Sequence, residues 1–272
     1  MNIAVAGLGL IGGSLALALR GTHQLRGYDT DAGTRDAAGR AGIQVVASLD
    51  DLLPADAVIV ATPLAAVLPT LAHLAPRAER AVLLDVASVR APVDAFARDQ
   101  QNGARLVGMH PMAGRSAQGF AAADPDLLRG RPFLVVPTAR SDADAMAVAG
   151  ALARDAGGVV TVMSAAEHDR IVAVLSALPL ALAAALSVTA AEAIAAPLEG
   201  LAGTGFRDAT RLALTTPELG EPLLAANSAH VVGALARLRE ALDEIERAVA
   251  ERDHGALREL LERAALVRKT LD

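Results

Sequence analysis

Gly7-Leu8-Gly9-Leu10-Ile11-Gly12 is the stretch that decides the fold, because it spaces three glycines as G-x-G-x-x-G. An apolar run at residues 3–6 precedes it and predicts a strand, and residues 11–20 follow with a helical pattern. In this strand–turn–helix context the first glycine permits the tight turn, the second lets the backbone approach a pyrophosphate, and the third lets helix and strand pack closely. The helix N-terminus adds free N–H groups and a positive dipole end, so the stretch predicts a dinucleotide site.

Short apolar runs alternate with helical patterns through the first part of the chain. The runs lack the polar alternation of a strand with one wet face, which favours a parallel sheet covered on both faces and a Rossmann-type α/β fold. The expected strands are 3–6, 24–28, 57–61, 81–85, a strand starting at 106–108, 133–136 and 159–162, and the early helices are 11–20 and 31–42.

From Ser164 onward the strand signals vanish, and alanine and leucine recur at helical spacing. Residues 227–251 and 255–271 have the pattern of two amphipathic helices. We therefore expect two domains: residues 1–163 as a nucleotide-binding Rossmann domain, and residues 164–272 as an all-helical domain for substrate binding and dimerisation.

Composition excludes several classes of function. The 272 residues carry a net charge of −6, which argues against a nucleic-acid partner, since such a protein needs a basic face. The chain has no cysteine, hence no thiolate metal site and no cysteine nucleophile, and we expect no bound metal. Its first residues have no basic leader and already form a strand pattern, so we expect no signal peptide and a cytoplasmic protein.

Residues 171–191 are uncharged over 21 positions, which is long enough to span a bilayer. Much of the stretch is alanine, which gains little on leaving water, and Pro179 interrupts it. We therefore expect no membrane span but a helix buried on all sides in the helical domain, or in the core of a dimer.

Asp29 lies at the end of the second expected strand, 17 residues after Gly12. A carboxylate there accepts hydrogen bonds from ribose hydroxyls and repels a 2′-phosphate, which predicts NAD rather than NADP. The alternative is a surface aspartate in an α/β fold that binds no nucleotide. Thr62-Pro63 follows another strand directly and is predicted to line the cofactor cleft, although an ordinary strand-ending turn explains it equally well.

Three further segments carry polar groups that the fold does not require. They are D-V-A-S-V-R at 85–90, G-M-H-P-M-A-G at 108–114 and G-T-G-F-R-D-A-T-R at 203–211. The first two follow strands and so fall at the carboxyl edge of the sheet, beside the expected nicotinamide. The third could bring cations to a cleft between the two domains.

With these motifs, G-L-G-L-I-G-G-S near the start and T-P-E-L-G at 216–220, the chain resembles the prephenate and arogenate dehydrogenase family over nearly its whole length. A-Q-G at 117–119 is most similar to the branch that includes cyanobacterial arogenate dehydrogenases. The resemblance implies an oxidoreductase and homodimer that uses NAD to convert prephenate to 4-hydroxyphenylpyruvate, with decarboxylation, in tyrosine biosynthesis. The alternative substrate is arogenate, which would give tyrosine.

The resemblance also implies roles for single residues. His110 would be the catalytic base that takes the proton of the ring 4-hydroxyl, a task suited to a neutral imidazole. Ser88 would hold the hydroxyl and the histidine in line, and Arg211 would grip a substrate carboxylate with its planar guanidinium. From the residues alone, His110 could be an ordinary loop histidine and Ser88 a helix cap.

Arg211 also has an alternative role without any substrate contact, since it could pair with Asp208 or with a helix C-terminus at the surface. Arg207 competes with it as the substrate cation, and only family position favours Arg211.

The chain departs from the family pattern at two places. Many members have S-H-L-P-H where this chain has S-A-L-P-L at 176–180, so two substrate-binding histidines are missing. An acidic residue that often follows H-P-M-A-G is replaced by Arg115-Ser116, and our hypothesis is that this pair contacts the substrate, with Arg115 supplying the lost positive charge. His168-Asp169 keeps a family-like position, where we expect a structural role at the domain junction.

Two other functions remain open on the sequence. Another dehydrogenase of similar build, acting on β-hydroxyacids or imines, is one; β-hydroxyacid enzymes rely on a lysine in the helical domain, and the single lysine here, Lys269, is close to the C-terminus. The other is a non-catalytic NAD-binding sensor, which would keep the glycine turn but has no need for His110 and Arg211 together.

Overall fold

The computed structural model describes residues 1–78, 80–101, 103–115, 117–194 and 200–270. By compactness the chain forms two units, Met1–Asn227 and Ser228–Asp272. The first unit contains the sheet together with the helices up to residue 226, so the predicted domain boundary at residue 163 stays a prediction.

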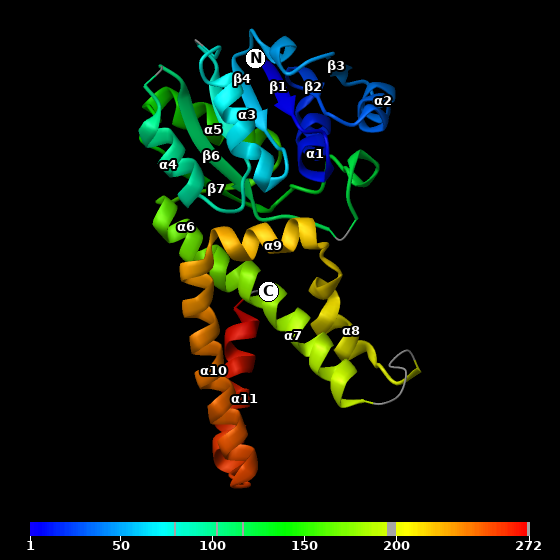
Figure 1. Ribbon diagram of the computed structural model, residues 1–272, viewed down its shortest axis with the longest axis vertical. Helices are drawn as coiled ribbons and strands as arrows, with labels where there is room; N and C mark the ends of the chain where they lie inside the picture. The colour runs from blue at the N-terminus through cyan, green and yellow to red at the C-terminus, as the bar shows by residue number, and fades with distance from the viewer. Residues whose placement is uncertain (79, 102, 116, 195–199, 271–272) are drawn as a thin grey trace. The chain divides into compact units, whose positions relative to one another are not determined.

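One eight-stranded sheet forms the centre of the first unit (Figure 1). Its strand order is β3-β2-β1-β4-β5-β6-β7-β8, and each neighbouring pair is parallel except β6 and β7. The strands are β1 Asn2–Ala6, β2 Gln24–Tyr28, β3 Gln44–Val45, β4 Ala57–Val60, β5 Val82–Asp85, β6 Arg105–Pro111, β7 Pro132–Pro137 and β8 Val159–Val162.

Helices cover both faces of the sheet, as the apolar strands predict. The side chains of β1 alternate between two cores: Ile3 and Val5 enter one, and Ala4 and Ala6 the other. Helices α1 and α5 contribute to the first core, and α3 and α4 to the second. Their bounds, with those of α2 and two short 3₁₀ turns, are α1 Leu10–Leu19, α2 Ala32–Arg40, η1 Asp50–Leu52, α3 Leu64–Leu74, α4 Ala91–Asp99, η2 Phe120–Ala122 and α5 Ala143–Asp155.

Two features of the sheet differ from the expectation. The predicted parallel sheet is confirmed for the other neighbouring pairs, but β6 and β7 pair antiparallel, with His110 opposite Leu134. Strand direction was not readable, because an apolar run has the same pattern in either orientation. The two-residue β3 was also missed, and β8 proves largely exposed because it lies at the edge of the sheet.

The first unit continues through a helical part, which comprises α6 Ala165–Val172, η3 Ala173–Ala177, α7 Leu178–Ala193, α8 Thr204–Thr210, η5 Arg211–Leu214 and α9 Pro217–Ala226. Helix α6 contacts α4 and β7, and α9 contacts α3. The parallel strands run from the end marked N towards these helices, so their carboxyl ends face the helical part (Figure 1).

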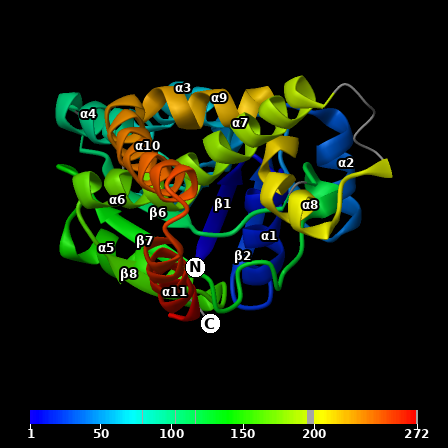
Figure 2. The same ribbon diagram turned by 90° about the horizontal axis from the view of Figure 1, so that it is seen from below.

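Residues Ala165–Ala193 form one helical run that is long and apolar enough to cross a membrane by length and composition alone (Figure 2). A π-helical stretch, Ala173–Ala177, precedes Pro179, as expected where proline removes a backbone donor. The expectation that this helix is buried on all sides within the chain is wrong, because Leu175 and Val188 are exposed. The alternative, burial in the core of a dimer, remains compatible with the structure.

The second unit consists of α10 Ser228–Ala250 and α11 His254–Lys269, which contact each other. Both predicted helices are confirmed to within three residues of their bounds. Arg252 takes a positive φ of 53° in the turn, and the Asp253 side chain caps α11 by accepting a hydrogen bond from Ala256 N.

A buried ion pair shapes the loop that leaves β5. The Arg90 guanidinium donates to both carboxylate oxygens of Asp85, with an Nη2–Oδ2 distance of 2.7 Å, and neither side chain is more than 1% exposed. The guanidinium lies against Gly108 of β6, where an added Cβ would be 2.6 Å from Arg90 Cζ. Glycine at 108 therefore makes room for the ion pair, and the ion pair holds residues 86–89 at the carboxyl edge of the sheet.

Replacing Asp85 should destabilise the protein strongly. An Asp85→Asn variant leaves the Arg90 charge buried without its counter-ion, and we expect the free energy of unfolding to fall by about 3–5 kcal/mol in urea denaturation. As a control, Asp126→Asn breaks an exposed pair with Arg129 and should cost less than about 1 kcal/mol. Equal, small losses in the two variants would contradict this account.

Candidate active site

The glycine turn has the geometry that its spacing predicts. Gly7 has a φ of +90°, and its N–H donates to the Tyr28 carbonyl at 2.8 Å, which joins the turn to β2. An added Cβ on Gly7 would lie 2.6 Å from the Ala61 carbonyl oxygen, and one on Gly12 would lie 1.9 Å from the Gly7 oxygen. A side chain at either position would push β1, α1 and β4 apart.

Gly9 differs from these two glycines, because an added Cβ there would meet nothing within 4 Å. Gly9 is the N-cap of α1 and no side chain caps it, while Gly13 N makes the first helical bond, to the Gly9 carbonyl. The N–H groups of Leu10, Ile11 and Gly12 thus precede the helical ladder and have no acceptor within it. An open backbone with free donors fits a pyrophosphate.

Asp29 is partly buried beside this turn. Its Oδ2 accepts a hydrogen bond from Leu8 N at 2.8 Å, and its Oδ1 accepts one from Asp31 N at 2.9 Å. Each carboxylate oxygen retains a lone pair, so Asp29 can still accept from ribose hydroxyls. Sequence reasoning missed Arg35, whose Nη1 donates to the Asp29 and Thr30 carbonyls at 2.7 and 3.0 Å. This cation at the same edge would soften the repulsion of a 2′-phosphate.

Thr62 and Pro63 follow β4 next to the glycine turn, with Thr62 N 2.9 Å from the position of an added Cβ on Gly7. The Thr62 hydroxyl oxygen is buried and has no hydrogen-bond partner in the described part of the chain, while Pro63 is exposed and caps α3. An unpaired buried hydroxyl beside an open glycine backbone is a further sign that the described residues fit a dinucleotide.

The loop after β6 packs on α1, and this contact explains the last two residues of G-L-G-L-I-G-G-S, Gly13 and Ser14. An added Cβ on Gly13 would lie 2.8 Å from Ala123 Cβ, and the buried Ser14 hydroxyl accepts from Asp124 N at 3.0 Å. In the same loop Gln118 Nε2 donates to Thr216 Oγ1 of T-P-E-L-G at 3.3 Å. The H-P-M-A-G loop is thus held by both the nucleotide-binding helix and the helical part.

The hypothesis about Arg115 meets a competing partner, because its Nη2 contacts Asp124 Oδ2 at 2.7 Å. Hydrogen bonds from Asp126 N and from Arg115 lower the pKa of Asp124, so this carboxylate is charged and partly neutralises the arginine. Ser116, predicted with Arg115 to contact the substrate, lies outside the described residues.

His110 is the second-last residue of β6, at the carboxyl edge of the sheet, which also carries the glycine turn. Its Nδ1 is 2.9 Å from His168 Nε2, and no residue in the described ranges hydrogen-bonds its Nε2. Burial, followed by electrostatic interactions with His168 and Arg90, lowers the pKa of His110 to about 3. The imidazole is therefore neutral at pH 7, as a general base must be.

His168 and Asp169 lie in the middle of α6, whose N-terminus is closed by a capping box of Ser164 and Glu167. Both are buried, and His168 Nδ1 is 2.8 Å from Asp169 Oδ1. Sequence reasoning gave this pair only a structural role, and it missed the contact with His110 because 58 residues separate the two histidines.

Ser88 follows β5, and β5 pairs with β6 so that Asp85 is opposite Gly108. Ser88, three residues after the end of β5, and His110, close to the end of β6, therefore lie at the carboxyl ends of two neighbouring strands. The alternative of Ser88 as the cap of α4 is wrong: the Asp169 carboxylate accepts from Arg90 N and Ala91 N instead, at 2.7 and 2.8 Å. The alignment of a substrate hydroxyl by Ser88 stays a prediction.

Arg211 begins η5 and is exposed, and in the described part of the chain no ion pair links it to Asp208. Within the same residues no hydrogen bond links it to His110, so the predicted convergence of these two side chains on one substrate stays a prediction. The competing cation, Arg207, donates from Nε to the Ala202 carbonyl at 3.3 Å.

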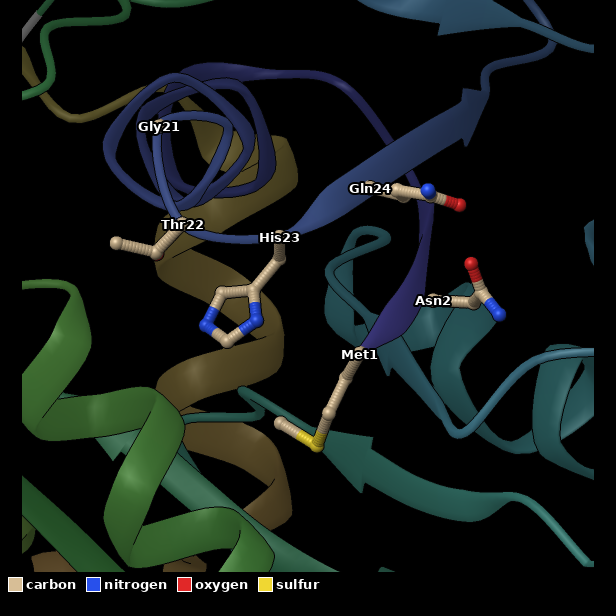
Figure 3. Close-up of a pocket in the computed structure, with 6 residues that line it drawn as sticks. All are labelled: Met1, Asn2, Gly21, Thr22, His23 and Gln24. Atoms are coloured by element: carbon tan, nitrogen blue, oxygen red, sulfur yellow. The ribbon is translucent and has the colours of Figure 1, made fainter.

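The described residues line two hollows, and His110 is in the lining of neither. One, at the amino ends of β1 and β2, is lined by Met1, Asn2, Gly21, Thr22, His23 and Gln24, opposite to the glycine turn (Figure 3). The other is an apolar groove between α7 and α9, lined by Leu180, Ala184, Thr215, Thr216, Pro217, Gly220, Glu221, Leu224 and Ala225. The groove brings the substituted S-A-L-P-L stretch next to T-P-E-L-G.

The carboxyl edge of the sheet carries a glycine turn at an open helix N-terminus, a carboxylate after β2 and a neutral histidine close to the end of β6. A helical part faces that edge within the same unit (Figure 1). These features define the class as dinucleotide-dependent oxidoreductases with a helical second part.

Family profiles match most of the chain: "Prephenate dehydrogenase, nucleotide-binding domain" matches residues 15–162, and "Prephenate dehydrogenase, dimerization domain" matches residues 164–263. The chain belongs to the prephenate dehydrogenase family. It is 30% identical over 270 residues to the cyclohexadienyl dehydrogenase of Zymomonas mobilis, which covers 95% of this chain and 92% of that protein.

Solved structures of the family agree along the whole chain. Arogenate dehydrogenase from Synechocystis is 31% identical with a TM-score of 0.85, covering 100% of both chains. Prephenate dehydrogenase from A. aeolicus, solved in complex with hydroxyphenyl propionate and NAD+, is 27% identical with a TM-score of 0.91, covering 100% of this chain and 98% of that one.

Replacing Asp29 should relax the choice between NAD and NADP. In Asp29→Ser the carboxylate no longer repels a 2′-phosphate, and Arg35 remains beside it. We expect the ratio of the two dissociation constants, measured by calorimetry, to shift towards NADP by about tenfold, or about 1.4 kcal/mol. Asp36→Ser, an exposed change on the helix α2 that follows Asp29, serves as the control and should leave the ratio unchanged. An unaltered ratio in Asp29→Ser would remove Asp29 from cofactor choice.

Proposed function

We propose that this protein is an NAD-dependent prephenate dehydrogenase, which converts prephenate to 4-hydroxyphenylpyruvate and CO2 in tyrosine biosynthesis. The observation that carries the proposal is a neutral His110 with an unengaged Nε2, at the sheet edge where the glycine turn opens. Family membership and the likeness to the A. aeolicus enzyme, whose structure holds hydroxyphenyl propionate and NAD+, support it.

The residues that would hold NAD are those of the glycine turn and its surroundings. Backbone N–H groups of Gly9, Leu10, Ile11 and Gly12 would face the pyrophosphate, and Asp29 would accept from the ribose. Thr62 and Pro63 would line the cleft at the end of β4. When bound, the nicotinamide supplies the acceptor for the hydride that leaves ring carbon C4 of the substrate.

His110 would handle the proton of the C4 hydroxyl. Its Nε2 takes this proton as hydride leaves C4, so that the C–O single bond becomes a carbonyl. The ring carboxylate then leaves as CO2, and the electrons of the broken C–C bond complete an aromatic ring with a phenolate oxygen. His110 returns its proton to that oxygen, so the enzyme ends in its starting state and protons balance.

Positioning of the substrate would fall to residues after β5, in the loop after β6 and in the helical part. Ser88 would hold the C4 hydroxyl in line with His110, since Ser88 follows β5 and His110 lies close to the end of the neighbouring β6. Arg211 would bind a substrate carboxylate, and Arg115 and Ser116 would contact the substrate from the loop after β6. The pairing of Arg115 with Asp124 makes Arg211 the better candidate for the carboxylate.

Arogenate is the second candidate substrate, and the groove between α7 and α9 favours it. This groove contains Leu180 instead of a family histidine, and Glu221 also lines it. A carboxylate there would attract the ammonium group of arogenate and repel the carboxylate of a pyruvyl side chain. The likeness to the Synechocystis arogenate dehydrogenase points the same way.

We also propose a cytoplasmic homodimer. The exposed apolar side chains on the helical run Ala165–Ala193 include Leu175, Leu182 and Val188, and a second copy would cover them. The match of residues 164–263 to a dimerization domain supports this assembly. The partners that we propose are thus the small-molecule substrate and a second copy of the chain, with neither nucleic acid nor membrane.

The substrate assay is the direct test of the proposed function. Purified protein is mixed with NAD and either prephenate or arogenate, and NADH absorbance and CO2 release are followed together. We expect equal amounts of NADH and CO2 from prephenate. Turnover of arogenate alone would establish the second candidate, and NAD binding without turnover of either would replace both with the sensor.

Replacing His110 should separate chemistry from cofactor binding. His110→Asn keeps a polar side chain but removes the base, so kcat should fall by about 10²–10⁴-fold while NAD affinity stays the same. His254→Asn changes an exposed histidine at the start of α11 and should keep wild-type kcat. A His110→Asn enzyme that retained its rate would remove His110 from the mechanism.

A further inference from the structure

A buried chain of hydrogen bonds continues inward from His110. Its Nδ1 contacts His168 Nε2 at 2.9 Å, and His168 Nδ1 contacts Asp169 Oδ1 at 2.8 Å. The ring centroids of the two histidines are 5.1 Å apart with the planes tilted by 57°. His168 has no exposed surface and Asp169 has 2%, so neither can touch a substrate directly.

Asp169 is ionised and firmly placed. Burial raises its pKa, but hydrogen bonds from His168 and from two backbone N–H groups outweigh burial, and the pKa is below its ordinary value. The backbone donors are Arg90 N and Ala91 N at the start of α4, where the helix dipole favours a negative charge. Asn227 Nδ2 also donates to the Asp169 carbonyl at 2.7 Å, which ties this part of α6 in place.

The proton positions on the two histidines follow from the Asp169 carboxylate at the inner end of these hydrogen bonds. A carboxylate only accepts, so Nδ1 of His168 must carry a proton and donate it. In its neutral form His168 has no second N–H, so its Nε2 is an acceptor. Nδ1 of His110 must then be the donor in the contact between the two rings. The lone pair of His110 is left on Nε2, the nitrogen that faces no described partner.

The same hydrogen-bonded groups would stabilise the positive charge that His110 acquires during catalysis. When Nε2 takes the hydroxyl proton, the imidazolium lies one ring away from the Asp169 carboxylate. The other charged groups around it are Arg90 and Asp85 at the end of β5, and they neutralise each other as a buried ion pair. Asp169 therefore supplies the net negative charge near His110, and His168 connects the two residues by hydrogen bonds.

We propose that His168 and Asp169 are positioning residues that hold His110 in its Nδ1–H tautomer and stabilise its cationic form during the reaction. The inference rests on the proposed function only in its kinetic part, since the tautomer can be observed without any substrate. It assigns to the H-D pair a role in the chemistry as well as in the packing of α6.

His168 is the residue to change, because Asp169 also caps α4 and its loss would disturb the fold. His168→Phe keeps a ring but removes the acceptor, and His168→Gln restores a carbonyl acceptor. We expect kcat to fall on the order of 10²-fold in the Phe variant, as for other losses of a partner that orients a catalytic histidine, and to recover in part in the Gln variant. KM and NAD affinity should stay close to wild type.

A control is His23→Phe, which removes another histidine–aspartate pair, here with an exposed aspartate, at the amino end of the sheet. His23 Nε2 contacts Asp155 Oδ2 at 3.0 Å beside the hollow in Figure 3. Because that site is at the opposite end of the strands from His110, kcat should stay at the wild-type value. A similar loss of kcat in both variants would mean a general effect on the fold and would overturn the proposal.

Nitrogen NMR of the protein with ¹⁵N-labelled histidine tests the tautomer directly, with His110→Asn assigning the signals. We expect His110 to carry its proton on Nδ1 in the wild type and to become a mixture of tautomers in His168→Phe. A proton on Nε2 in the wild type, or an unchanged tautomer and kcat in His168→Phe, would overturn the proposal. Wild-type protein that turns over neither substrate, yet has the Nδ1–H tautomer, would refute the proposed function while keeping this inference.

Discussion

The buried carboxylate of Asp169 is the contact on which the site depends. It accepts the backbone N–H groups of Arg90 and Ala91 at the start of α4 and the imidazole of His168 from its own helix. A single negative charge thus joins the loop after β5, the first helix of the helical part and, through His168, the edge of β6. Such a charge is tolerated in the interior because every one of its contacts is a donor. The orientation of His110 follows from this arrangement.

In the glycine turn, the structure depends on positions that have no side chain. Gly7 and Gly12 let β1, α1 and β4 approach to distances at which no Cβ would fit, and Gly9 leaves the backbone of the turn open. Gly13 does the same for the loop after β6, which packs on α1 and also reaches Thr216. The nucleotide-binding helix and the loop that follows His110 are therefore parts of one packed assembly, and a proton acceptor is placed at the edge where a nicotinamide would lie.

Much of the first unit was predictable from local pattern. The strands at 24–28 and 159–162 match residue for residue. For 159–162 the reason is a run of four β-branched residues, which favours a strand. The antiparallel pairing of β6 with β7 was not predictable, since direction leaves no trace in a run of apolar residues. The exposure of the Ala165–Ala193 run was also unexpected, because composition reports what a helix must hide and not which chain hides it.

The sequence alone determined the glycine turn, the acidic residue after β2 and the H-P-M-A-G histidine, because each depends on residues close together in the chain and on backbone rules that act locally. Only the tertiary structure decided that His168 meets His110, that Asp169 and not Ser88 caps α4, and that Arg35 stands beside Asp29. These contacts join elements that are brought together by packing, and the hydrogen-bonding capacity of a side chain does not specify which distant partner packing will supply.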